Sequence, residues 1–500
     1  MRPLRWFLCA ALCWPLAVGA DPISLRHDGE TVAEGELLGF DGRYYRILGP
    51  MGEVTLDGRL LDCRGADCPD PDAPELFRIS GERSVVTTVL PALIETFARR
   101  EGYDLGREVN GVATEYSLAR DGEIRARMTL MATSSAEGFA DIVADLTDVA
   151  VTLRPPDEVE LALMREAGRG DLTDADRRAI LGLDAVVPVV SALSGRRAIT
   201  VEEIAAWPPD ALHIPDPNSS AGEAVLRHFP ALADGQAIIH PTLDALTEAV
   251  MQSPVALGLT LYSAHGDSLP LTLTGPCGAS VSADPQTLKT EDYPLMAPVY
   301  LYAPMRRLTD VARDFMRYAA SPIAQGVIQR AGLVDQFPQV IPFAEQGERL
   351  GLAILSAEGD RSVAGLKRMV GDLQDKARLT LTFRFKDGSS VLDAPSQDNV
   401  DRLAAAVMGG IFDQRRLVFA GFSDGDGAFL ANRRLSRERA EAVRDAVVEM
   451  SPAADVLLDV EAYGEVLPIA CDETSWGRQL NRRVEVWLGE DSTENPLPGN

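Results

Sequence analysis

Apolar and polar positions alternate with two different periods along the chain, and the change of period divides it. Residues 21–75 contain segments such as ISLRHDG, VAEGELLGF and GEVTLDG, in which apolar and polar residues alternate between glycine turns. A period of two is typical of half-buried strands. These residues therefore predict a small β-rich module, and the acidic, proline-rich segment CPDPDAPE at its end predicts a linker.

From Leu76 onward, strand patterns alternate with amphipathic helix patterns. LFRISG, TDVAVTL, AVVPVVSAL and VYLYAP predict strands, whereas VVTTVLPALIETFARREG and TVEEIAAW predict helices. The second helix begins with a capping box formed by Thr200 and Glu203. Strands that alternate with helices form parallel sheets covered by helices. Because residues 76–344 form a stretch that is long for a single sheet, the pattern predicts two α/β lobes with a cleft between them.

The last part of the chain predicts a further domain. Residues 345–375 are polar with scattered charges and predict a helical or extended linker. RLTLTFRF, QDNVDRLAAAVMG, RLVFAGF, ANRRLSRERAEAVRDAVVEM, VLLDVEAYG and RRVEVWL follow. This order predicts a compact β-α-β-α-β-β domain of the α+β class at residues 376–490, with a short tail at 491–500.

The N-terminus has the pattern of an export signal. Arg2 and Arg5 precede the apolar run Trp6–Leu16, and small residues follow up to Ala20. The run is too short for a comfortable membrane span. We therefore expect residues 1–20 to be a signal peptide, and we expect no transmembrane segment after its cleavage.

The net charge limits the classes of partner that suit the chain, and the cysteines bear on the disulfides that it can form. The net charge of −27 argues against nucleic acid or an anionic membrane surface as a partner. In an exported chain, the short spacing in CRGADC predicts a disulfide between Cys63 and Cys68. A metal site at these two cysteines is the alternative, but no histidine lies nearby to complete it. Cys277 and Cys471 fall in different predicted domains, so we expect them to be unpaired.

The sequence offers no recognisable catalytic apparatus. It contains no HExxH, GxSxG, Walker A or Rossmann glycine motif, and its five histidines show no metal-ligand spacing. The DGDG segment lacks the third oxygen ligand and the distal glutamate of a calcium loop. We therefore expect a protein that is not an enzyme and that needs no cofactor or metal.

Serine and threonine residues stand at several predicted strand-to-helix turns of residues 76–344. A helix N-terminus has free N–H groups and a partial positive charge, which suit an anion. The same residue types are preferred helix caps, so each turn alone is open to a structural interpretation. Several such turns in one two-lobed unit favour a cleft for a small polar or anionic ligand. The candidate cleft residues are Gly81, Arg83, Ser84, Ser134, Ser135, Thr152, Arg154, Ser219 and Ser220.

Residues 76–342 resemble the phosphate-type periplasmic binding proteins, which have a two-lobed type II fold. LFRISGERSVV, TDVAVTLRPPDEVE, ITVEEIAAW and YPLMAPVYLY follow the order of that family. The resemblance implies that helix-start amides and hydroxyls, together with an arginine, hold phosphate. HIPDPNSSAGEA lacks the arginine and the Ser-Gly-Thr turn that the family has there. We therefore expect weak phosphate binding unless Arg83 or Arg154 replaces that arginine.

One helix near the C-terminus places a charge on its apolar stripe. Val443, Val447 and Met450 recur at helical spacing, and Arg439 lies one turn before Val443. A buried guanidinium needs an acid or a ligand anion, and Asp424 at the end of the preceding strand is the obvious neighbour. Two interpretations are open: a structural salt bridge between the two residues, or a binding site.

Residues 378–488 resemble the OmpA-like peptidoglycan-binding domain. GFSDGDGAFLANRRLSRERAEAV and NRRVEVWL follow its pattern of Gly-x-x-Asp, Asn, Leu-Ser, Arg-Ala and Asn-Arg-Arg-Val-Glu. The resemblance implies that Asp424 takes the ammonium and Arg439 the carboxylate of a diaminopimelate stem peptide. For Arg482 and Arg483 in the terminal run, we favour a structural role in packing the last strand. The implied peptidoglycan-binding residues are Asp424, Arg439, Asn432 and Ser423.

Together these observations predict a cell-envelope protein of the periplasm, associated with peptidoglycan or the outer membrane. It would anchor non-covalently through its C-terminal domain and bind a small, phosphate-like anion in the cleft. One alternative is the substrate-binding component of a phosphate ABC transporter. Another is an envelope scaffold whose binding-protein fold holds no ligand.

Overall fold

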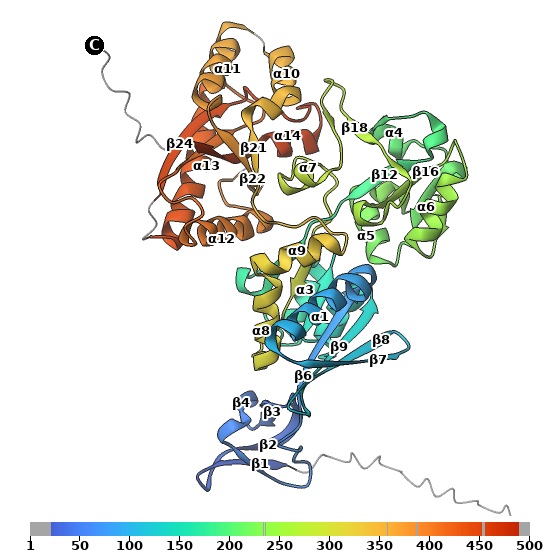
Figure 1. The fold of residues 1–500 in the computed structure, drawn as a ribbon, viewed down its shortest axis with the longest axis vertical. Helices are drawn as coiled ribbons and strands as arrows, with labels where there is room; N and C mark the ends of the chain where they lie inside the picture. The colour runs from blue at the N-terminus through green and yellow to red at the C-terminus, as the bar shows by residue number, and fades with distance from the viewer. Residues whose placement is uncertain are drawn as a thin grey trace, which may run out of the picture.

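The structure is a computed structural model that describes residues 22–233, 235, 237–357, 359–386, 389–452 and 456–489. The described chain forms four units: a small β module, two α/β lobes and a C-terminal domain (Figure 1). The β module lies at one end of the long axis, lobe 1 follows it, and lobe 2 and the C-terminal domain lie beyond (Figure 1). The predicted signal peptide and tail lie outside the described residues.

The N-terminal module is an antiparallel sheet, as its alternating pattern predicts. Its strand order is β4-β3-β2-β1-β5. Ile23, Leu25, Tyr45 and Ile47 form its small core, and the predicted disulfide between Cys63 and Cys68 is present. The strands are β1 (Ile23–His27), β2 (Glu30–Phe40), β3 (Tyr44–Gly49), β4 (Gly52–Asp57) and β5 (Asp62–Arg64).

Lobe 1 is built on a seven-stranded sheet with the order β11-β20-β10-β6-β9-β8-β7. The central pairs β10–β6 and β6–β9 are parallel, as strand–helix alternation predicts. Its strands are β6 (Glu75–Glu82), β7 (Asp104–Asn110), β8 (Ala113–Arg120), β9 (Glu123–Thr133), β10 (Val149–Thr152), β11 (Arg178–Gly182) and β20 (Val299–Tyr302). Its helices are α1 (Leu90–Glu101), α2 (Ser135–Val143), α3 (Glu158–Glu166), α8 (Asp310–Ala319) and α9 (Pro322–Arg330).

Lobe 2 has a five-stranded sheet with the order β15-β14-β16-β12-β17 and a small three-stranded sheet beside it. The main sheet contains β12 (Val186–Val190), β14 (Leu212–Pro215), β15 (Ile238–His240), β16 (Leu257–Leu261) and β17 (Leu269–Pro270). The small sheet contains β13 (Ala198–Thr200), β18 (Thr272–Thr274) and β19 (Ser280–Val281). The helices are α4 (Val201–Ala205), α5 (Ser220–His228), α6 (Leu243–Met251) and, on the way back to lobe 1, α7 (Pro285–Lys289).

The chain passes between the two lobes at paired backbone segments. Leu183 pairs with Val334, and Ala185 pairs with Met296. One hydrophobic core cluster continues from lobe 1 through these crossings into lobe 2. The two predicted lobes are thus confirmed, and the segments around Leu183–Ala185 form their hinge.

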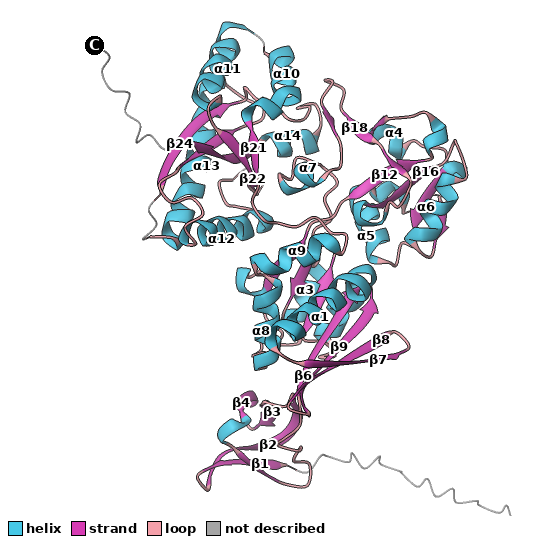
Figure 2. Ribbon diagram, viewed as in Figure 1, coloured by secondary structure: helices cyan, strands magenta, loops and turns pink. Residues whose placement is uncertain are grey.

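The C-terminal domain packs helices against a sheet with the order β21-β22-β25-β23-β24 (Figure 2). The strands are β21 (Val340–Pro342), β22 (Ala377–Arg384), β23 (Arg416–Phe422), β24 (Leu457–Gly464) and β25 (Arg483–Gly489). The helices are α10 (Gly347–Ser356), α11 (Gly359–Leu373), α12 (Ala394–Met408), α13 (Phe429–Met450) and α14 (Ser475–Asn481). Three details differ from the sequence prediction. Residues 345–375, which we predicted to be a linker, form α10 and α11, and these helices share a hydrophobic core cluster with β23. Residues 340–342 pair with β22 instead of completing the binding lobes, and α14 interrupts the predicted final pair of strands.

The C-terminal domain is linked covalently to lobe 2. Cys277 and Cys471, which we expected to be unpaired, form a disulfide across 194 residues of sequence. The prediction is wrong because the two domains pack together, and sequence distance says nothing about that. Buried ion pairs accompany the disulfide: Arg378 Nη1 lies 2.6 Å from Asp292 Oδ2, and Arg178 Nη2 lies 3.5 Å from Asp398 Oδ1.

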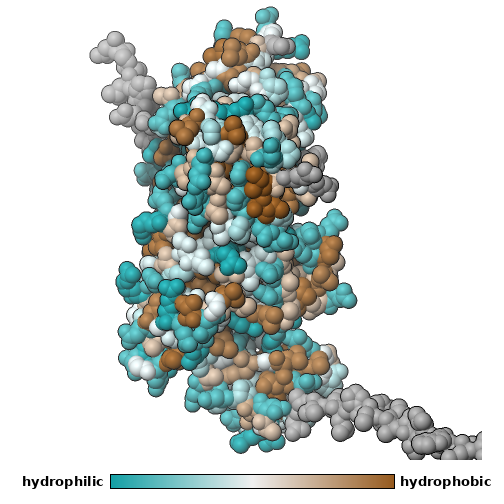
Figure 3. All heavy atoms as spheres, turned by 90° about the vertical axis from the view of Figure 1, so that its right-hand side faces the viewer, coloured by the Kyte–Doolittle hydropathy of each residue, from teal (hydrophilic) through white to brown (hydrophobic). Residues whose placement is uncertain are grey.

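The surface mixes polar and apolar residues. On the face drawn in Figure 3, hydrophilic residues separate small groups of hydrophobic ones. Within the described residues, no helix combines the length and apolar character that crossing a membrane requires.

Candidate functional site

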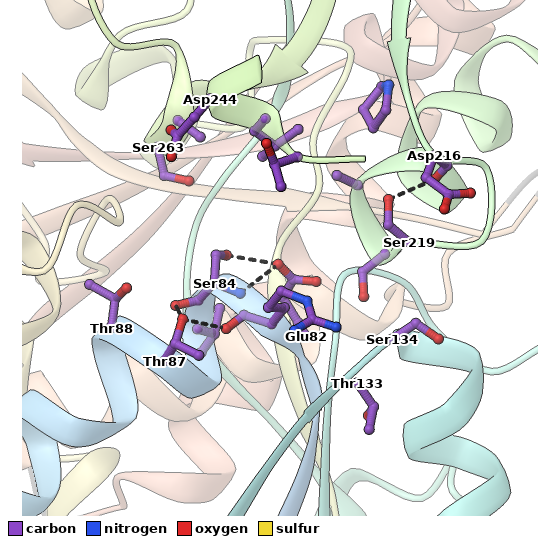
Figure 4. Close-up of a pocket in the computed structure, with 18 of the residues that line it drawn as sticks. Glu82, Ser84, Thr87, Thr88, Thr133, Ser134, Asp216, Ser219, Asp244 and Ser263 are labelled. Carbon is purple, nitrogen blue, oxygen red and sulfur yellow. Dashed lines mark hydrogen bonds between the residues drawn. The ribbon is translucent and has the colours of Figure 1, made fainter. Parts of the chain in front are cut away.

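A cleft of about 550 Å³ lies between the two lobes. Lobe 1 contributes the turns after β6 and β9, and lobe 2 contributes the turns after β14, β15 and β16. Figure 4 shows Glu82 and Ser84 on one side, with Asp244 and Ser263 facing them from the other. Five of the predicted cleft residues line it: Arg83, Ser84, Ser134, Ser219 and Ser220.

Ser84 and Ser134, at the helix starts of lobe 1 that line the cleft, are already bonded to acidic side chains of the same lobe. Glu82 Oε1 accepts hydrogen bonds from Ser84 N–H at 3.1 Å and from Ser84 Oγ at 2.7 Å. Glu137 Oε2 accepts from Ser134 N–H at 2.9 Å, and Ser134 Oγ accepts from Glu137 N–H in return. The turns that the sequence suggested for an incoming anion therefore already hold carboxylates of the chain itself.

The cleft is acidic. Glu82, Glu137, Asp216 and Asp244 line it, against the single guanidinium of Arg83, so these groups carry a formal charge of −3. His240 also lines the cleft, and burial lowers its pKa, which disfavours its charged form. Sequence reasoning missed these acids, although each lies beside or within a turn that it had singled out or predicted. An acidic wall repels a free anion.

Gly81 and Thr152 do not reach the cavity. Gly81 has φ +131°, and a Cβ there would lie 2.0 Å from the Val151 carbonyl oxygen, so glycine permits the close approach of β6 and β10. Thr152 is fully buried, and its Oγ1 donates to the Arg154 carbonyl at 2.8 Å. Both residues support the lobe 1 sheet behind the cleft instead of lining it.

Ser135 and Arg154 lie beside the cleft instead of lining it. Ser135 is fully buried, and its Oγ accepts from Leu153 N–H at 3.1 Å. Arg154 donates Nη1 and Nη2 to the two oxygens of Glu160 at 2.7 and 2.8 Å. It also donates Nε to Glu223 at 2.6 Å. Burial alone would lower the pKa of Arg154, but the bonds to Glu160 and Glu223 raise it.

The hinge connects to the cleft through a buried acid. Asp184 Oδ1 accepts from Ser263 N–H at 3.1 Å, and Oδ2 accepts from Ser263 Oγ at 2.5 Å. Ser263 lines the cleft. Burial raises the pKa of Asp184 to about 6, against the lowering effect of these hydrogen bonds.

The second candidate site lies in the C-terminal domain, where β23 ends and α13 packs against it. Asp424 follows β23, and its Oδ2 pairs with Arg482 Nη1 at 2.9 Å. Asp424 and Arg439 do not form the salt bridge that was one interpretation of the sequence. Arg482, to which we assigned only a packing role, instead contacts the predicted ligand acid. The sequence hides this contact because Arg482 lies 58 positions further along the chain.

Arg439 is buried and incompletely bonded. Its side chain projects from α13 toward Phe385, with the guanidinium carbon 5.1 Å from the ring centre. Nη2 donates to the Ser389 carbonyl at 3.2 Å. Nε and Nη1 are buried and have no hydrogen-bond partner among the described residues. Burial and the nearby Arg482 lower the pKa of Arg439, whereas Asp424 raises it.

The remaining predicted residues hold the Asp424 loop in place. Asn432 Nδ2 donates to the Asp424 carbonyl at 3.3 Å and to Glu465 Oε2 at 2.6 Å. Ser423 Oγ donates to the Asp424 carbonyl at 2.9 Å. Gly425 N–H donates to Asp472 Oδ2 at 2.8 Å, and Asp472 follows the disulfide-bonded Cys471. The loop is thus pre-organised by its own Ser423, by α13 and by the segment that follows the disulfide.

Arg483 has the structural role that the sequence suggested. It is fully buried, and its Nε donates to Glu485 Oε1 at 2.7 Å. Glu485 also pairs with Arg349. Although burial opposes it, these cations hold the pKa of Glu485 below its usual range.

The C-terminal domain matches a known family. Residues 384–482 match the model of the OmpA family. Similar curated proteins include outer membrane porin F of Pseudomonas aeruginosa, 40% identical over 66 residues, which cover 13% of this chain and 19% of the porin. Porin F of Pseudomonas fluorescens is 32% identical over 109 residues, which cover 22% of this chain and 32% of the porin. The chain thus spans less than a third of the length of these relatives.

Solved structures similar to the chain include an ABC-type phosphate transport receptor from Vibrio cholerae. It is 14% identical, with a TM-score of 0.39, over 52% of this chain and 99% of the receptor. The periplasmic domain of Helicobacter pylori MotB is 20% identical, with a TM-score of 0.21, over 24% of this chain and 78% of that domain. Likenesses at these identities and scores say nothing about the ligand of this chain.

Proposed function

We propose that this chain is a non-enzymatic cell-envelope protein that binds peptidoglycan through its OmpA-family domain and carries a small-ligand cleft in its two lobes. The buried Arg439 beside the Asp424–Arg482 pair carries the first part of the proposal. Two of its guanidinium nitrogens have no partner among the described residues, although they are buried. A buried donor without a partner is costly, and a ligand carboxylate would satisfy it.

The ligand that suits this arrangement is zwitterionic. A diaminopimelate end carries an ammonium and a carboxylate on one carbon. Asp424 supplies the acid for the ammonium, and Arg439 supplies the guanidinium for the carboxylate. The Ser389 carbonyl accepts from Arg439 Nη2 at 3.2 Å, and a ligand carboxylate that binds this nitrogen would replace it. The similarity of part of this chain to outer membrane porins supports an envelope location.

Co-sedimentation of the mature chain, which we take to be residues 21–500, with purified peptidoglycan sacculi tests the anchor. We expect Asp424→Asn and Arg439→Gln to weaken binding by about 2–5 kcal/mol, because each change leaves one ligand charge unpaired. Added salt should weaken wild-type binding, since both contacts are ionic.

Asp426→Asn and Arg434→Gln are matched controls, because these side chains are 79% and 78% exposed in the same loop and helix. They should pellet like wild type. If the folded Asp424 and Arg439 variants also pellet like wild type, the charged residues are structural and the anchor lies elsewhere.

For the cleft, a phosphate-like anion is the ligand class that the sequence resemblance implies. Arg83 and Ser84 on the cleft wall support it, whereas four carboxylates oppose it. Delivery of phosphate to a membrane permease also suits the chain poorly, because the lobes are tied to a domain that we propose is wall-bound. Thermal-shift measurement with phosphate and uncharged polar compounds tests the cleft, since a bound ligand raises the melting temperature by linkage.

A further inference from the structure

The two lobes are joined at one end of the cleft by contacts that need no ligand. Ser135 N–H, at the start of α2 in lobe 1, donates to Ser220 Oγ of α5 in lobe 2 at 2.8 Å. Ala136 N–H donates to Glu223 Oε1 at 3.3 Å. Arg154 of lobe 1 donates Nε to Glu223 Oε2 at 2.6 Å. We call these five residues the interlobe latch.

Glu223 is bound in the way that a free oxyanion would be. One of its oxygens accepts from the first turn of α2, where the helix carries free N–H groups and a partial positive charge. Its other oxygen accepts from a guanidinium, which is the strongest donor to an oxyanion among side chains. Lobe 2 therefore places a carboxylate against the anion-binding donors of lobe 1.

The donors of the latch are saturated. Arg154 gives its two terminal nitrogens to Glu160 and its Nε to Glu223. Ser135 is fully buried, and Ser220 is 1% exposed. An incoming phosphate would have to displace the Glu223 carboxylate from these donors while facing the acidic wall of the neighbouring cleft.

We propose that Glu223, which lies beside the cleft, acts as a built-in anion: it keeps free oxyanions from the donors of the latch and holds the lobes together. The proposal rests on the cleft being a ligand site. Lobe closure then depends on a side chain of the protein and not on a captured anion.

Titration calorimetry of the mature chain with inorganic phosphate and with sulfate tests this inference. Wild type should give no measurable binding of either ion. Glu223→Ala should bind phosphate at least tenfold more tightly than wild type, because it frees Ala136 N–H and Arg154 Nε. Adding Arg154→Gln to Glu223→Ala should abolish the gain. The matched control is Glu158→Gln, which removes one charge from an exposed position on α3 and should behave like wild type.

Small-angle scattering supplies a second measurement. Glu223→Ala without ligand should have a larger radius of gyration than wild type, and phosphate should reverse the change. If Glu223→Ala fails to fold, the isosteric Glu223→Gln takes its place and should give the same direction of change in both measurements.

Three outcomes would overturn the inference, and they differ in what they say about the cleft. If wild type binds phosphate as tightly as Glu223→Ala, the cleft is a ligand site but Glu223 does not exclude anions. If Glu158→Gln gains as much as Glu223→Ala, net charge alone is responsible. If neither wild type nor the Glu223 variants bind phosphate or sulfate, the latch is no anion site. If, in addition, no other compound raises the melting temperature, the proposed ligand role of the cleft also fails.

Discussion

Arg154 in the lobes and Arg439 in the C-terminal domain are both largely enclosed arginines near a predicted binding site, but their surroundings differ. Arg154 has two carboxylates as partners and hydrogen bonds from all three of its nitrogens. Arg439 has one backbone carbonyl at 3.2 Å and two buried nitrogens without a partner among the described residues. An arginine with a full set of partners is held by its own fold, whereas buried donors without a partner would gain from a ligand acceptor. The comparison therefore places Arg154 in the latch and supports our proposal that Arg439 belongs to a ligand site.

The acids near the two arginines also differ in whether they pair with the arginine. Glu160 and Glu223 compensate Arg154 within the folded chain. In the C-terminal domain, Asp424 is paired with Arg482, and Arg439 stands next to that pair. We propose that the second site offers positive charge to a ligand carboxylate, whereas the cleft beside the first is acidic. Arginine near a predicted site is thus informative only together with its partners.

The largest expected effect comes from separating the two regions. Replacing Cys277 and Cys471 by serine removes a link that closes 194 residues. By the chain-entropy estimate, the free energy of unfolding should fall by about 5 kcal/mol. The matched double variant at Cys63 and Cys68, whose separation is 5, should lose about 2 kcal/mol. Chemical denaturation followed by tryptophan fluorescence measures both.

The same experiment shows whether the regions unfold together. With the long link removed, we expect two transitions instead of one, because the C-terminal domain has hydrophobic clusters of its own. Equal losses for the two disulfide variants would mean that non-covalent contacts alone unite the domains.

A smaller effect tests the arginine comparison itself. Arg154→Met leaves Glu160 and Glu223 without their cation and should lower the free energy of unfolding by about 3–4 kcal/mol. Arg439→Met removes a buried charge that has one hydrogen bond, so its cost should stay within about 1 kcal/mol. Thermal and chemical denaturation measure both. A loss at Arg439 as large as that at Arg154 would show that Arg439 is structural.

The smallest expected effect is a pH dependence of the free energy of unfolding, which arises from Asp184 between the lobes. Because the folded-state pKa of Asp184 is about 6, above its ordinary 3.8, the folded chain binds this proton more tightly than the unfolded chain does. The resulting stability is fully present below about pH 4 and is lost as the pH rises to about 6, by up to about 3 kcal/mol. Asp184→Asn should remove this slope from the pH profile of the melting temperature. An unchanged slope in that variant would assign it to other groups.

The sequence by itself determined the local architecture. Alternating residues predict the N-terminal sheet, strand–helix alternation predicts the two lobes, and a period of 3.6 places Arg439 on the inner face of α13. The close spacing of Cys63 and Cys68 predicts their disulfide. These features follow from residues that are near one another in the chain, where backbone geometry converts spacing into a shared face.

Only the tertiary structure decided the partners of the charges. Asp424 pairs with Arg482 instead of Arg439, Glu223 reaches Arg154 from the other lobe, and Cys277 finds Cys471 in another domain. Each of these contacts joins residues that are 58 or more positions apart. Periodicity carries no information over such distances, because the relative placement of whole lobes and domains sets them. That placement decides which arginine has its hydrogen bonds satisfied by the fold and which one keeps buried nitrogens without a partner among the described residues.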